Sequence, residues 1–120
     1  MAERAVPPDD ISPEAFFTEW VPAAIAGDPT RRARLGAAPI DIEFTLEGDG
    51  GGVYAVRIRD GVICGSVGTL AEAHLHVRTD VATWRELNRG DLSAPEAFLR
   101  RRVHLHGKLL LAVKLHLILG

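Results

Sequence analysis

Four of the five histidines stand in two His-x-His steps, a spacing that can bind a metal ion. The first step is His74 and His76, and the second is His104 and His106. In a strand, side chains two residues apart point to the same face and lie about 7 Å apart. Two imidazoles at that separation can close around one ion such as zinc. Each His-x-His step is therefore a candidate metal-binding pair.

The competing interpretation is that the histidines are the outward side of two half-buried strands. Apolar residues alternate with them, namely Leu75, Val77, Val103 and Leu105. If those residues face the core, the histidines face outward. No Asp or Glu alternates with the histidines, and their expected same-face neighbours, Arg78 and Arg102, would repel a cation. We expect solvent-facing histidines and no catalytic group, and metal binding stays open as an alternative.

Composition indicates one soluble domain with no nucleic-acid partner. The 120 residues are 47% hydrophobic and 25% charged, with a formal net charge of −2. The basic runs at 31–34 and 100–102 are local and do not form the basic face that nucleic acid requires. Cys64, the single cysteine, has no partner for an internal disulfide.

The two ends of the chain bear on location. Residues 1–11 are charged and contain prolines where a signal peptide would be apolar, so we expect a flexible arm on a cytoplasmic protein. Residues 12–120 then form the single domain. The most apolar stretch, 109–119, is about half the length that spans a bilayer. No transmembrane segment is expected.

The pattern of elements predicts an α+β fold. Ser12 and Pro13 are typical of a helix start, and a further helical turn or two is expected at 30–35. Period-two alternation at 40–47 indicates a half-buried strand. Further strands are expected at 53–60, 61–67, 74–79 and 102–107, and helices at 80–90, 93–100 and 108–119. Strands followed by helices and a returning strand favour helices packed on one sheet face.

Glycine-rich turns join the first three predicted strands. The dipeptide Asp60-Gly61 is a strong hairpin signal, because both central residues of that turn favour positive φ. The run at 48–52 is also interpreted as a turn. A phosphate-binding loop would lead into a helix, whereas a strand follows here.

Six local features in this order resemble the sterol carrier protein family, the type-two lipid-transfer domain. They are Tyr54 on a strand, the turn at 60–61, the helix end at 87–90, the short helix at 95–98, the strand at 103–107 and the Ala-x-Lys-Leu stretch at 112–115. The resemblance covers about residues 35–118. It implies a five-stranded mixed, mainly antiparallel sheet with helices on one face, and an apolar tunnel that takes lipid-like molecules. It implies no catalytic residue and no cofactor.

The last predicted helix is apolar around almost its whole circumference. Between residues 108 and 119 only Lys108, Lys114 and His116 are polar. An ordinary surface helix has one apolar stripe, so this helix needs cover on two sides. One side is expected to face the sheet. The other is expected to line the tunnel, to form a homodimer contact or to make transient contact with a membrane.

The expected function is non-enzymatic binding or transfer of a lipid-like small molecule. The alternative is an accessory module that presents hydrophobic intermediates, such as a quinone or polyketide, to biosynthetic enzymes. Apolar pockets bind through plain hydrophobic residues at concave positions. Each tunnel candidate is also a candidate for simple core packing; the candidates are Trp84, Leu87, Phe98, Leu99, Leu105, Leu109, Leu110, Val113 and Leu117.

Overall fold

Helices cover one face of a five-stranded sheet. The computed structural model describes residues 6–119, with side chains as far as residue 116. The strands are β1 (Ile40–Glu47), β2 (Gly52–Arg59), β3 (Val62–Val67), β4 (Leu75–Asp80) and β5 (His104–Gly107). Their order is β3-β2-β1-β4-β5; β1 and β4 are parallel, and all other neighbours are antiparallel. The expected α+β class and mixed, mainly antiparallel sheet are confirmed.

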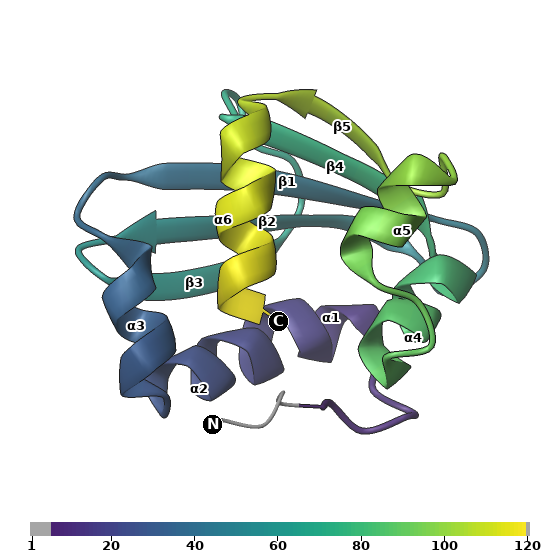
Figure 1. Ribbon diagram of the computed structural model, residues 1–120, viewed down its shortest axis with the longest axis horizontal. Coiled ribbons are helices and arrows are strands. Elements are labelled where there is room, and N and C mark those ends of the chain that lie inside the picture. The colour runs from purple at the N-terminus through teal and green to yellow at the C-terminus, as the bar shows by residue number, and fades with distance from the viewer. Residues whose placement is uncertain (1–5, 120) are drawn as a thin grey trace.

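The helices gather around the apolar face of that sheet. They are α1 (Pro13–Ala15), the π-helical turn η1 (Phe16–Trp20), α2 (Val21–Ala26), α3 (Pro29–Leu35), α4 (Val81–Arg89), α5 (Ala94–Leu99) and α6 (Leu109–Leu119). Figure 1 shows α6 crossing in front of the strands, α1 to α2 running below them, and α4 and α5 at one end. Along β1 the residues that face these helices are buried, and Asp41, Glu43 and Thr45 between them are partly exposed.

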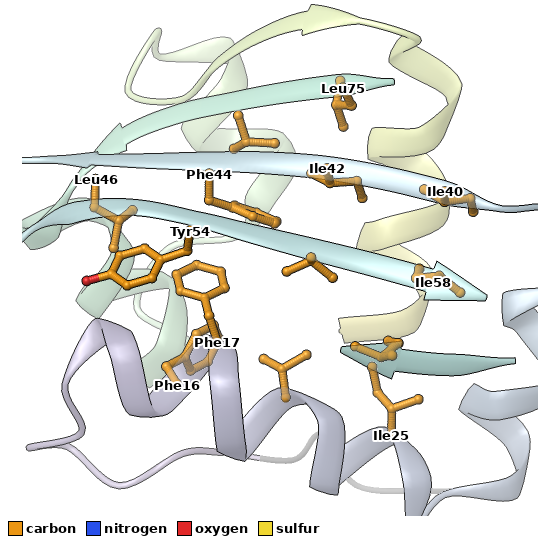
Figure 2. Close-up of a cluster of buried hydrophobic side chains, with 14 of the residues drawn as sticks. Phe16, Phe17, Ile25, Ile40, Ile42, Phe44, Leu46, Tyr54, Ile58 and Leu75 are labelled. Atoms are coloured by element: carbon orange, nitrogen blue, oxygen red, sulfur yellow. The ribbon is translucent and has the colours of Figure 1, made fainter. Parts of the chain in front are cut away.

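Aromatic side chains of η1 form the centre of the core. Phe17 stacks on Tyr54 with ring centroids 5.0 Å apart and contacts Phe44 at 4.7 Å. Figure 2 shows Phe17 pointing from the helix toward these strand residues. The helix starts where the sequence predicts, because Ser12 Oγ accepts a hydrogen bond from the Ala15 N–H. Burial, and then the charge of Glu14, raises the pKa of the Tyr54 phenol.

A glycine allows η1 to approach β3 closely. A Cβ atom at Gly65 would lie 1.8 Å from the carbonyl oxygen of Phe17. No residue with a side chain fits that space without moving the helix away from the strand. Gly65 therefore sets the distance between the aromatic helix and this edge of the sheet.

The predicted hairpin turn between β2 and β3 is confirmed. Asp60 and Gly61 have φ values of 51° and 76°, the positive pair that a type I′ turn requires. The caps of the later helices are also where the sequence predicts them. The Asp80 carboxylate accepts from Thr83 N–H at 2.7 Å, and Ser93 Oγ accepts from Glu96 N–H at 3.2 Å.

Residues before the first helix lie against α4. Pro7 is buried, and Arg85 Nη1 donates to the carbonyl oxygens of Asp9 and Ile11, each at 3.0 Å. The first five residues of the expected N-terminal arm lie outside the described part of the chain.

Candidate apolar binding site

Helix α6 lies over the apolar face of the sheet, and one of its two apolar sides faces the sheet. Leu111, Ala112 and Leu115 are half-buried and pack against the core. The helix follows Gly107, whose φ is 115°, and Lys108 N–H donates to the His74 carbonyl at 2.8 Å. Close backbone contact fixes that junction, since a Cβ at Gly107 would lie 2.4 Å from the same oxygen.

A narrow hollow separates α6 from β1 and β2. Its lining residues are Ile40, Ile42, Ile58, Leu111, Lys114 and Leu115. The hollow offers about 10 Å³ of free volume, which is at the lower limit of the roughly 10–15 Å³ that holds one water molecule. Helix and sheet are therefore in near contact here, and a lipid chain could enter this space only if α6 moved outward.

The structure separates the tunnel candidates into inward and outward groups. Trp84 is only 4% exposed and belongs to the core, where its indole meets the Phe16 ring edge-on at 5.2 Å. Leu87 and Leu105 are half-buried. The remaining described candidates are exposed, namely Phe98, Leu99, Leu109, Leu110 and Val113. The side chain of Leu117 lies outside the described residues.

Sequence reasoning missed the inward side of α6. Leu111, Ala112 and Leu115 were not among the candidates, although Leu111 and Leu115 have the four-residue spacing of one helix face. The exposed side of α6 is also apolar, so hydrophobicity in the sequence does not distinguish the two sides. Only contact with the sheet distinguishes them.

One polar atom near the core has no protein partner. The Trp84 Nε1–H group is buried and donates no hydrogen bond among the described residues. A buried N–H without an acceptor is uncommon in folded proteins and costs free energy. It is a donor available to an oxygen atom that enters the core beside α4.

The opposite, open face of the sheet carries the histidines. His76 lies directly across from His106 on β5, and their ring centroids are 6.0 Å apart. His104 and His106 are exposed, while His74 and His76 are half-buried. His74 Nδ1 accepts a hydrogen bond from the Asp41 N–H at 2.9 Å, so that nitrogen carries no proton.

Two expectations about the surroundings of the histidines are corrected. An acidic neighbour is present, because parallel pairing places Glu43 of β1 beside His76, and Glu43 Oε2 lies 3.2 Å from His76 Nδ1. Arg102 is not a same-face neighbour. Its side chain binds the Glu86 carboxylate and donates to Thr83 Oγ1 at 3.2 Å, on the helical side of the sheet.

That ion pair joins the start of β5 to α4. The hydrogen bond to Glu86 raises the pKa of the Arg102 guanidinium.

The histidine face shows no metal-binding cluster, because residues 6–116 contain no group of three side chains arranged to hold a metal ion. Glu43, His76 and His106 are neighbours in one row across three strands, without converging on one point.

Comparison with solved structures shows the fold. No family model and no curated protein matches the sequence. The structure resembles palmitated SCP2L2 from Aedes aegypti, with 16% identity and a TM-score of 0.69 over 92% of this chain and 96% of that one. It resembles the ubiquinone synthesis protein UbiJ-SCP2 at 11% identity and a TM-score of 0.64, over 88% of this chain and 89% of that one. The chain therefore has the fold of sterol carrier protein 2 domains.

The same fold occurs inside a larger enzyme. The sec-alkylsulfatase Pisa1 from Pseudomonas sp. matches 92% of this chain with 21% identity and a TM-score of 0.71. The match spans only 16% of the sulfatase, so this chain corresponds to a small part of that enzyme. In the part of the chain that the structure describes, no helix is long and apolar enough to cross a bilayer.

Proposed function

We propose that this protein binds a lipid-like molecule non-enzymatically, with the apolar chain of the ligand between α6 and the sheet. The observation that carries the proposal is the packing of α6. An apolar helix covers the apolar sheet face, its described inward side chains are no more than half-buried, and it leaves a hollow over Ile40, Ile42 and Ile58. The fold supports the proposal, since a solved domain of this fold is described as palmitated.

Opening this space is energetically reasonable. Each buried methylene contributes roughly 0.8 kcal/mol, so a chain of about sixteen carbons gains about 12 kcal/mol before costs. Loss of translational and rotational freedom opposes binding by roughly 4 to 15 kcal/mol. The ligand would replace contacts that α6 now makes with the sheet. At the lowest of these costs about 8 kcal/mol remains, so a dissociation constant no tighter than about 1 μM is expected without any charged anchor.

The direct test is to identify what the protein retains on purification. Organic extraction followed by mass spectrometry should find a long-chain amphiphile near one equivalent per chain. Delipidated protein should then take up a fluorescent fatty acid with saturable binding. A delipidated, folded protein that binds neither fatty acids nor isoprenoid quinones would contradict the proposal.

Neighbouring residues on α6 offer a matched pair of variants. Ala112 is half-buried against the core, whereas Val113 is 57% exposed. Ala112→Trp should place an indole between α6 and the core and weaken fatty-acid uptake at least about fivefold, since overpacking a filled site costs ~1–3 kcal/mol. Val113→Trp places the same indole outside and should bind like the wild type. Circular dichroism and thermal melting establish that both variants are folded. Equal uptake by the two would move the site away from α6.

A second candidate function is presentation of an apolar substrate to an enzyme. Two observations favour it: the fold matches a protein named for ubiquinone synthesis, and it also matches a small part of a sulfatase. In this case the ligand would be a biosynthetic intermediate or an alkyl substrate. Stimulation of a partner enzyme by the loaded protein, and loss of that stimulation with Ala112→Trp, would distinguish presentation from simple storage.

A further inference from the structure

We propose that the chain docks on anionic lipid bilayers through a surface formed by α5, the start of α6 and the segment that joins them. This docking surface consists of Phe98, Leu99, Arg101, Lys108, Leu109, Leu110 and Val113. The inference goes beyond the proposed function and does not depend on it, because a protein can bind a bilayer whatever it carries inside.

The charges of the sequence are strongly separated along the chain. All 16 Asp and Glu residues lie in residues 1–96. Five of the 14 Lys and Arg residues lie in residues 97–120, which contain no acid. The chain as a whole has a formal net charge of −2, whereas all the Asp, Glu, Lys and Arg side chains found in residues 97–120 are positive. Such an asymmetry indicates a partner with negative charge.

The exposed apolar side chains are found in the same segment. Among the described residues, eight large hydrophobic side chains are exposed, and five of them belong to the docking surface. Leu99 and Leu110 are the most accessible, at 79% and 84%. They flank β5, a strand of four residues and about 13 Å. Figure 1 shows α5 and α6 on the same side of the sheet.

Two cations of the docking surface are available to a partner. Arg100 pairs with Glu96, and Arg102 pairs with Glu86. Arg101 and Lys108 are exposed and form no ion pair within the described part of the chain. Exposed leucines beside unpaired cations are the combination that binds a bilayer surface, because the leucines enter the acyl boundary and the cations meet anionic head groups.

The charges favour a bilayer over a second copy of the chain. In a two-fold dimer through this surface, Lys108 and Arg101 of each copy would meet the same positive surface of the other. No acidic side chain follows Glu96 to neutralise them. An anionic bilayer avoids this repulsion because it supplies negative charge. It also accepts apolar side chains without requiring a complementary protein surface.

The experiment measures sedimentation of the whole chain with vesicles. Vesicles of phosphatidylcholine alone are compared with vesicles containing about one third phosphatidylglycerol, a composition that attracts basic segments. The protein should bind the anionic vesicles at least about tenfold more strongly, and added salt should weaken that binding because salt screens surface charges. Equal binding to the two vesicle types, or binding to neither, would overturn the proposal.

Paired substitutions localise the surface. Leu110→Glu should lower partitioning onto anionic vesicles at least about tenfold, since a leucine is withdrawn and a repelled charge introduced. Val62→Glu, at a 59% exposed position on β3, should not change it. Lys108→Glu should lower partitioning about tenfold, and Arg32→Glu, on α3, should leave it unchanged. Equal effects of a variant and its control would mean that net charge alone attracts the protein, and would overturn the assigned surface.

Self-association is measured without vesicles. Sedimentation velocity over a range of concentrations should show a monomer for the wild type and for Leu110→Glu. A wild-type dimer that Leu110→Glu dissociates would assign the surface to a second copy and overturn the proposal.

Discussion

At the scale of single residues, Trp84 combines a packed ring with a buried donor that has no partner. The side chain packs in the core against Phe16, and its indole N–H has no acceptor among the described residues. The packing would be retained by another aromatic ring. The unpaired donor is specific to tryptophan, and a ligand oxygen is the partner that would justify its cost.

Trp84→Phe tests that donor. The change removes an unsatisfied N–H but leaves a small void, so the free energy of unfolding should change by no more than about 1.5 kcal/mol. Binding of palmitate should weaken roughly tenfold or more, as expected for loss of one hydrogen bond to a charged group. Diphenylhexatriene has no acceptor oxygen, so its binding should not change. Fluorescence displacement assays measure binding of palmitate and of diphenylhexatriene in parallel.

Trp20→Phe is the matched control for this variant. Trp20 stacks on the same Phe16 ring at 5.4 Å but is half-buried, at the edge of the core. It should affect neither ligand. If Trp84→Phe weakened both ligands equally, Trp84 would serve packing alone.

At the scale of elements, the contact between η1 and β3 depends on a missing side chain. Gly65→Ala places a Cβ against the Phe17 carbonyl, and both partners are backbone, so neither can rotate away. We expect a loss of about 3 kcal/mol in the free energy of unfolding, typical of an overpacked core. Urea denaturation measures it.

Gly27→Ala is the control for the loss of unfolding free energy expected of Gly65→Ala. Gly27 ends α2 with φ −84°, and an added Cβ would lie 3.5 Å from the Ala23 carbonyl oxygen, an ordinary van der Waals distance. Its effect should be within about 0.5 kcal/mol. Similar losses at the two glycines would show that the contact with Phe17 relaxes easily.

At the scale of the whole molecule, the fold joins a firm sheet to a more weakly held last helix. β1 has hydrogen-bonded neighbours on both sides and four buried apolar residues. In α6 every described side chain is exposed or only half-buried. A ligand site between the two would use the sheet as a rigid floor and α6 as the movable part.

Hydrogen exchange should resolve this difference. Amides of α6 should exchange at least about tenfold faster than those of β1, because opening α6 breaks fewer buried contacts. Saturating palmitate should slow exchange in α6 and leave β1 nearly unchanged, since the bound ligand contacts both α6 and the sheet and stabilises the folded complex. Mass spectrometry of peptides covering 40–47 and 108–119 gives both rates. Protection of α6 equal to that of β1 without ligand would argue against opening.

The sequence by itself determined the local features of this protein. Alternation predicted β1, Ser12 and Asp80 predicted helix starts, and Asp60-Gly61 predicted the turn between β2 and β3. These features depend on dihedral preferences and on hydrogen bonds between residues a few positions apart. Neighbours in sequence carry that information, and the order of such features was enough to indicate the fold.

Only the tertiary structure decided which apolar side of α6 meets the sheet and what stands beside the histidines. The helix is apolar all round, so Leu111 and Leu110 are equivalent in pattern, yet one is half-buried and the other exposed. Glu43 reaches His76 across 33 positions of sequence. Contacts of this kind follow from strand register and from the packing of whole elements, which no local preference of the chain specifies.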